Sequence, residues 1–256
     1  MRIFTFLLII YFPISLIAQT SFEQHKETRD YLNFYHFAQL KNSGEFNDQN
    51  LKSGKWEEYQ LQYDSANQEI DIEIVRNGFS KPLKFLTPTE LIKCVSIYKN
   101  GELHNKRECF EAQYNSDNSI WWEITEEINY SSGIRDGVMK EYSLGKIFHV
   151  ANYTDGFLNG SEIYYPYSET PKIEIIWKMD TVLMGKWFND KGVLLTKKDY
   201  QNWPMISVIE FYPDGTPNLK FSAKGDAEIL HGEYKIYDEQ GLLKEIKSYD
   251  SGALVE

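Results

Sequence analysis

The sequence predicts an all-β protein, an extended single-layer antiparallel β-meander built from hairpin repeats of about 23–24 residues. Two strings carry this prediction. Tyr-x-x-Gly occurs six times and Gly-x4-Tyr four times, whereas 18 Tyr and 16 Gly in 256 residues would give about one of each by chance. In addition, Asn-Gly and Asp-Gly pairs, which supply the positive φ angles of tight hairpin turns, recur along the chain.

The two strings join into one repeating unit. The first copy consists of Tyr130, Gly133, Gly137 and Tyr142, and every position recurs 23 residues later as Tyr153, Gly156, Gly160 and Tyr165. A strand and its turn occupy about a dozen residues, so one such unit equals one hairpin. A helical interpretation is disfavoured because Gly or Pro interrupts the pattern, at a cost of about 1–3 kcal/mol each inside a helix.

Six Asn-Gly or Asp-Gly pairs are expected at tight turns between the strands. They are Asn77-Gly78, Asn100-Gly101, Asp136-Gly137, Asp155-Gly156, Asn159-Gly160 and Asp214-Gly215. Between the turns, residues alternate in polarity, as in 70–74, 173–175 and 234–236. Alternation places one set of side chains on a packed face and the other set in water.

This pattern resembles the MORN repeat and, more closely, the bacterial MORN-variant repeats, a family that includes antitoxin-labelled members. The resemblance covers 98–256, with a further candidate stretch at 54–63, and is clearest in the two units above. It is degenerate elsewhere: Gly185-Lys186-Trp187-Phe188 keeps the glycine and the aromatic residues but has Asp190 where Tyr is expected. The resemblance implies a single-layer antiparallel sheet and a non-catalytic role. The first residues are typical of an exported protein, as described next, and an antitoxin acts in the cytosol. We therefore do not assign the antitoxin role to this chain.

The first 18 residues are typical of a secretory signal peptide. Met1-Arg2 gives a positive start, Ile3 to Ile17 is almost wholly apolar, and Ala18 precedes a polar stretch. The alternative is an uncleaved anchor, but this run of 15 residues is shorter than the roughly 20 that a membrane-spanning helix needs. We therefore expect export to the periplasm or the extracellular medium, with no transmembrane span after removal of the signal.

The predicted organisation has three parts: the signal peptide at 1–18, an N-terminal segment at 19–50, and the MORN-like β-repeat domain at 51–256. Residues 22–40 lack Gly and Pro and are expected to form a short helix that caps the sheet. Residues 42–50 are polar and are expected to form a loop.

Cys94 and Cys109 are the only cysteines, and they flank the turn pair Asn100-Gly101. Strands that fold back at this turn bring the two sulfur atoms face to face or one register apart, which suits a disulfide. The alternative is two buried free thiols.

The sequence offers no strong catalytic constellation. The five His residues are not spaced as metal ligands on one element, and no nucleophile elbow or phosphate-binding loop occurs. Glu123, Glu126 and Glu127 follow Trp121-Trp122, and carboxylates beside tryptophans can mark a sugar-cleaving cleft. Solvated carboxylates on a sheet explain the same residues without chemistry. Trp121 and Trp122 are also candidates for stacking a ligand, as is Trp177.

The expected function is that of a secreted, non-enzymatic scaffold without a cofactor, which binds an unknown protein or envelope component. The chain carries 27 Lys+Arg against 38 Asp+Glu, a formal charge of −11, and this balance disfavours nucleic acid as a partner. The alternatives are a carbohydrate-binding module and a hydrolase that acts on a surface polysaccharide.

Overall fold

The computed structural model describes residues 32–33, 36–63, 69–76, 79–86, 88–165, 170–225 and 227–255. This part of the chain is almost entirely β-strand, so the predicted fold class is confirmed. Leu32, Asn33, His36 and Phe37 are its helical residues. The predicted signal peptide and most of the predicted helical cap lie outside the described residues. Within them, no helix has the length and apolar character needed to cross a membrane.

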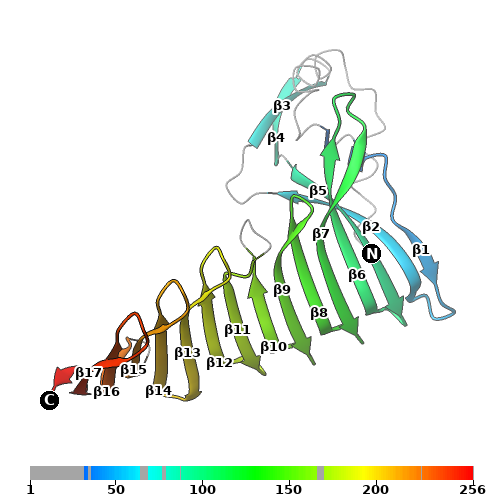
Figure 1. The fold of residues 1–256 in the computed structure, drawn as a ribbon. Helices are drawn as coiled ribbons and strands as arrows, with labels where there is room; N and C mark the ends of the chain where they lie inside the picture. Colours follow the sequence, from blue (N-terminus) through cyan, green and yellow to red (C-terminus); the bar gives the residue numbers. More distant parts are fainter. Residues whose placement is uncertain are drawn as a thin grey trace. The chain divides into compact units, whose positions relative to one another are not determined.

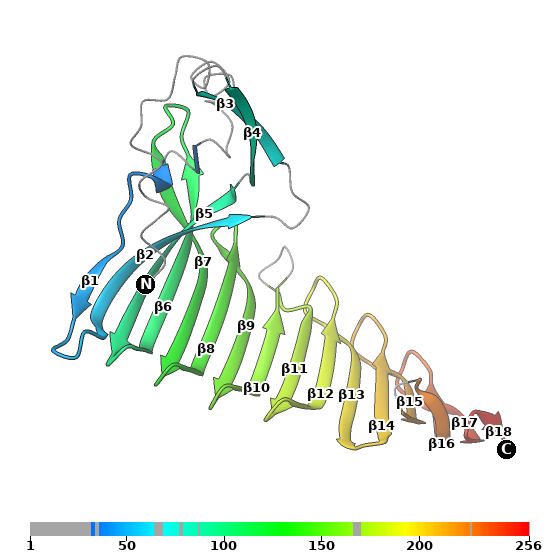
Figure 2. The ribbon, with the colours of Figure 1, turned by 180° about the vertical axis from the view of Figure 1, so that it is seen from behind.

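The strands follow one another with short connections (Figure 1, Figure 2). They are β1 (Ser43–Phe46), β2 (Lys52–Tyr63), β3 (Glu69–Arg76), β4 (Phe79–Leu86), β5 (Pro88–Lys99), β6 (Glu102–Tyr114), β7 (Ile120–Ser131), β8 (Ile134–Ser143), β9 (Lys146–Thr154), β10 (Phe157–Tyr164), β11 (Ile173–Lys178), β12 (Thr181–Phe188), β13 (Leu194–Asn202), β14 (Met205–Phe211), β15 (Pro217–Lys224), β16 (Ile229–Tyr237), β17 (Leu243–Asp250) and β18 (Ala253–Leu254). Strand β1 corrects the expectation of a loop over 42–50.

In the described part of the chain, sixteen strands form one antiparallel sheet in the order β1-β2-β5-β6, and then β7 to β18 in sequence. Strands β3 and β4 form a separate two-stranded sheet. The chain divides into two compact units. Unit 1 comprises the described residues of Met1–Ser43, Glu57–Val95 and Phe110–Glu123, and unit 2 comprises those of Gly44–Trp56, Ser96–Cys109 and Ile124–Glu256. Figure 1 shows β8 to β17 of unit 2 side by side in sequence order.

The glycine of the Tyr-x-x-Gly string closes a two-residue hairpin turn in five of the six copies, whereas Gly215 lies in a longer connection between β14 and β15. Asn100-Gly101 has φ angles of 51° and 86°, and Asp155-Gly156 has the same values. Positive φ at both central residues is what a type I′ turn requires. Gly133 closes an equivalent turn, with φ of 78°, although Ser132 and not Asn or Asp precedes it. The predicted Asn77-Gly78 turn lies outside the described residues.

Two of the predicted turns are wrong, because Asp136-Gly137 lies inside β8 and Asn159-Gly160 lies inside β10. Both glycines have positive φ, 108° and 107°, and the strand pairing shifts register beside each of them. They therefore form β-bulges, which need positive φ just as a tight turn does.

An asparagine stabilises each bulge from the neighbouring strand. Asn129 Nδ2 donates to the carbonyl of Val138 at 2.7 Å, and Asn152 Nδ2 donates to that of Ser161 at the same distance. A Cβ at Gly137 would lie 3.2 Å from the Cβ of Asn129, so a side chain there would crowd this contact. The 23-residue repeat therefore includes the asparagine as well as the tyrosines and glycines.

From β7 to β17 the buried side chains gather on one face of the sheet, which we call the packed face. Register pairing aligns Ile128, Met139, Ala151, Glu162 and Ile175 across five consecutive strands on this face. Ile128, Met139 and Ala151 form a buried cluster against which Tyr130 and Tyr153 pack. The repeat tyrosines therefore cover the apolar residues on this face of the sheet.

The opposite face carries a row of lysines and is called the lysine face. Lys140, Lys186, Lys197, Lys220 and Lys235 share one row of the register. Three of them pair with glutamates on the same face: Lys140 with Glu127, Lys186 with Glu174 and Lys235 with Glu233. These ion pairs reduce the positive charge of the lysine face. The amino-acid composition, which is acidic overall, does not indicate that the lysines share one face.

Both cysteines are disulfide-bonded, and since the chain has only two, the bond joins Cys94 to Cys109 as predicted. Both side chains are buried. A disulfide is typical of proteins that fold in an oxidising compartment.

We expect the purified chain, unfolded in denaturant without reductant, to react with no thiol reagent, because both sulfur atoms are in the bond. After treatment with a reductant, both cysteines should be labelled, and mass spectrometry of the labelled chain measures this. Two labels before reduction would contradict the disulfide.

Candidate functional site

The packed face carries a buried polar cluster centred on Glu162 of β10, here called the Glu162 cluster. His149 of β9 places its Nε2 atom 3.0 Å from Glu162 Oε1 and its Nδ1 atom 2.7 Å from Oε2 of Glu141 on β8. Tyr164 donates its hydroxyl to Glu162 Oε1 at 2.8 Å, and Trp177 of β11 donates Nε1–H to Glu162 Oε2 at 2.8 Å. His149 and Glu162 are only 7% and 6% exposed.

The hydrogen bonds of Glu162 in this cluster all go to neighbouring side chains. The His149 ring lies between two carboxylates, with one ring nitrogen within hydrogen-bonding distance of Glu141 and the other within hydrogen-bonding distance of Glu162. The His149 ring also stacks on Tyr164, with centroids 4.2 Å apart and an interplanar angle of 11°. Glu162 uses both oxygens as acceptors for its neighbours. It therefore holds the indole of Trp177 in place, and each of its two carboxylate oxygens already has at least one hydrogen-bond partner within the protein.

Burial raises the pKa of Tyr164 to about 12, and the hydrogen bond and charge of Glu162 act in the same direction. The unfolded chain loses this phenol proton near pH 10.0. The folded chain retains the proton, so the stabilisation from this group is complete below pH 10.0 and is lost as the pH rises through about 12.

We therefore expect the phenolate absorbance that differs between the wild type and Tyr164→Phe to have a midpoint near pH 12 in the folded chain. In denaturant, the same difference should have a midpoint near 10. A folded-state midpoint near 10 would contradict the contact between Tyr164 and Glu162.

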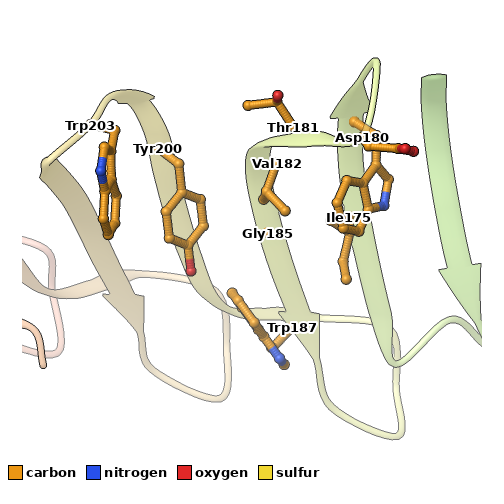
Figure 3. Close-up of a pocket in the computed structure, with 9 residues that line it drawn as sticks. Ile175, Asp180, Thr181, Val182, Gly185, Trp187, Tyr200 and Trp203 are labelled. Atoms are coloured by element: carbon orange, nitrogen blue, oxygen red, sulfur yellow. The ribbon is translucent and has the colours of Figure 1, made fainter. Parts of the chain in front are cut away.

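Next to the Glu162 cluster, the packed face is hollowed into an aromatic groove of about 520 Å³ over β11, β12 and β13. The groove is lined by the rings of Trp177, Trp187, Tyr200 and Trp203, with Ile175 and Val182 between them. Figure 3 shows Tyr200 and Trp203 on one side of Val182 and Ile175 on the other, with Trp187 below. Asp180 and Thr181 add a carboxylate and a hydroxyl to the lining. This volume lies within the range of about 300–1,000 Å³ that is usual for ligand pockets.

Gly185 explains why the groove forms at this point of the sheet. It pairs with Ile175 on one side and Lys198 on the other, and it leaves a gap in the row of side chains on the packed face. The indole of Trp187 fills part of this gap: a Cβ on Gly185 would lie 2.5 Å from ring atom Cη2. Lys198 places its Nζ atom 5.6 Å from the Trp187 ring centroid and also pairs with Glu228.

The groove thus lies where the sequence repeat is degenerate, around Gly185 and Trp187. The sequence singled out Gly185-Lys186-Trp187-Phe188 only as a departure from the repeat. Of the groove residues, Trp177 alone was a candidate for stacking a ligand. Trp187, Tyr200 and Trp203 were missed because their proximity depends on strand register, which the spacing of aromatic residues does not specify.

The two tryptophans predicted to stack a ligand lie in unit 1 and differ in exposure. Trp121 is 47% exposed. Trp122 is partly buried, with its ring centroid 5.8 Å from that of Tyr59 and 5.1 Å from the Nζ atom of Lys93. The Trp122 ring therefore packs against neighbouring side chains and the Trp121 ring faces solvent, as expected for adjacent residues of a strand. A role for either one in ligand binding stays a prediction.

The carboxylates suspected of hydrolysis have separate environments. Burial raises the pKa of Glu126 above its ordinary value, despite the opposing charge of Arg107. Burial would raise the pKa of Glu127 too, but the hydrogen bond and charge of Lys106, together with Lys140, lower it. Glu127 is therefore held in ion pairs on the lysine face. Glu123 belongs to unit 1, whereas Glu126 and Glu127 belong to unit 2.

In the described residues, no three His, Cys, Asp or Glu side chains are arranged to hold a metal ion. The site is therefore defined by the Glu162 cluster and the aromatic groove. No protein-family model matches the sequence, and no curated protein matches it either. The resemblance to MORN-like repeats stays a prediction that rests on the residues themselves.

Proposed function

We propose that this chain is an exported, non-enzymatic binding scaffold that holds a macromolecular ligand on the packed face of its sheet. The observation that carries the proposal is the aromatic groove. It presents partly exposed rings on an open antiparallel sheet, and Trp203 is 54% exposed. Large aromatic side chains on an accessible face are the usual anchors of recognition sites.

The polar groups near the groove support binding and not catalysis. Glu162 accepts hydrogen bonds from three neighbouring side chains. Asp180, the carboxylate in the lining, accepts the backbone N–H of Leu158 at 2.6 Å through Oδ1. Glycoside hydrolysis needs two carboxyl groups that face each other across the scissile bond, one of them able to donate a proton. The carboxylates beside this groove instead have structural partners.

Site-specific photo-cross-linking tests the proposal. A photoreactive residue at Thr181, on the groove, is compared with the same residue at Lys220, on the lysine face. Both chains are incubated with an extract of the native envelope and medium and then irradiated. We expect a high-molecular-mass adduct from position 181 that unlabelled wild-type chain competes away, and little adduct from position 220. No adduct from 181, or equal adducts from both, would contradict the proposal.

A further inference from the structure

The geometry points to a ligand class: we infer that the aromatic groove binds a neutral polysaccharide chain, with its sugar rings stacked on Trp177, Trp187 and Trp203. This inference rests on the proposed function and narrows the partner to one chemistry. It is carried by the ring faces, the charge of the lining and the open form of the groove.

The ring faces suit a pyranose. One face of a pyranose ring carries mainly C–H groups, which are weakly positive, whereas the face of an indole is negative and apolar. Stacking the two removes apolar area from water and leaves the equatorial hydroxyls at the rim. Asp180 and Thr181 lie among the lining residues and can accept or donate hydrogen bonds to such hydroxyls.

The charges around the groove favour a neutral ligand. Asp180 contributes a carboxylate to the lining, and Glu162 lies behind Trp177, so an anionic chain would be repelled. A cationic ligand would seek the face of an aromatic ring. At Trp187 the chain already places the ammonium of Lys198 near the ring, and Glu228 balances that charge. Lys198 thus already takes the position over this ring that a cationic ligand would need.

The arrangement of the rings favours a chain over a single sugar. Trp177 lies on β11, Trp187 on β12, and Tyr200 on β13. Neighbouring strands are about 4.8 Å apart, so the backbones of β11 and β13 are separated by roughly 10 Å, and Trp203 directly follows β13. Successive sugars of one chain can therefore meet successive rings. Trp177 is held for this contact by its hydrogen bond to Glu162, which makes Glu162 a positioning residue.

The experiment is isothermal titration calorimetry on the full chain. The neutral probes are cellohexaose, chitohexaose, xylohexaose and maltohexaose, and hexagalacturonate is the anionic probe. The matched variants are Trp203→Ala in the groove and Trp121→Ala outside it, since the two side chains are similarly exposed, at 54% and 47%. Trp187→Ala, checked for folding by far-UV circular dichroism, is a second groove variant.

We expect at least one neutral hexasaccharide to bind, and to bind more tightly than its disaccharide. Trp203→Ala and Trp187→Ala should weaken binding by about tenfold or more, and Trp121→Ala should leave it unchanged. Hexagalacturonate should bind more weakly than the best neutral probe. No binding of any neutral hexasaccharide, tighter binding of hexagalacturonate, or full binding by both groove variants would overturn the inference. If an adduct still formed at position 181, the ligand class would be wrong and the scaffold function would stand.

Discussion

Replacing Glu162 with alanine is expected to lower the free energy of unfolding by about 1–3 kcal/mol, the cost of leaving buried polar groups without their hydrogen-bond partner. The carboxylate is 6% exposed and accepts hydrogen bonds from His149, Tyr164 and Trp177. Alanine would leave the buried His149 and the partly buried Tyr164 and Trp177 without this hydrogen-bond partner, and each unsatisfied group carries a desolvation cost. Equilibrium unfolding in urea measures the change.

Glu174→Ala is the matched control for this variant. Glu174 lies on the adjacent strand β11, on the lysine face, and pairs with Lys186 at 2.8 Å. Both partners are partly exposed, and ion pairs of that kind contribute about 0–1 kcal/mol. We therefore expect a loss several times smaller than that of Glu162→Ala. Equal losses would show that Glu162 is not the centre of a buried network.

Replacing Gly185 with valine is expected to close the aromatic groove by displacing Trp187. The new Cβ would lie 2.5 Å and 2.8 Å from atoms of the indole ring, so the ring must move. Overpacking of this kind costs about 1–3 kcal/mol. Because Gly185 does not adopt the left-handed conformation, the backbone itself accepts valine, and the cost arises from the ring. Near-UV circular dichroism of the tryptophans and urea unfolding measure the two effects.

A double-mutant cycle isolates the cause. In the Trp187→Ala background the ring is absent, so Gly185→Val should then cost much less than in the wild type. The difference between the two costs is the coupling energy between positions 185 and 187. An equal cost in both backgrounds would mean that valine disturbs the strand and not the ring, which would contradict our explanation of the groove.

The hairpin architecture could be predicted because its determinants are local. Gly133 and Gly156 need only their own positive φ angles to close a turn, and the 23-residue spacing follows from one strand-turn-strand unit. The same local signal failed at Gly137 and Gly160, because a β-bulge and a tight turn both demand a residue that tolerates positive φ. Asn129 and Asn152 bond the bulges from neighbouring strands, and the spacing of Tyr and Gly does not reveal such contacts.

The site could not be predicted because it depends on register. His149 meets Glu162, 13 residues later, only because the bulge at Gly160 shifts the pairing of β9 with β10. Likewise, Lys198 meets Trp187 only because it lies opposite Gly185, the one residue of that row without a side chain to intervene. A change of one residue in either pairing would place these side chains on opposite faces of the sheet. The spacing of residues in the sequence does not specify the strand register to within one residue.

The most direct test of the central claim, that the aromatic groove is the ligand-binding site, uses the indole N–H signals of the six tryptophans in a nitrogen–proton correlation spectrum. Single Trp→Phe variants assign the signals, and the chain is titrated with the neutral hexasaccharide that binds best. Our account predicts shifts for Trp177, Trp187 and Trp203, with Trp56, Trp121 and Trp122 unmoved. Shifts confined to Trp121 and Trp122, or no shift for any groove tryptophan at saturating ligand, would contradict it.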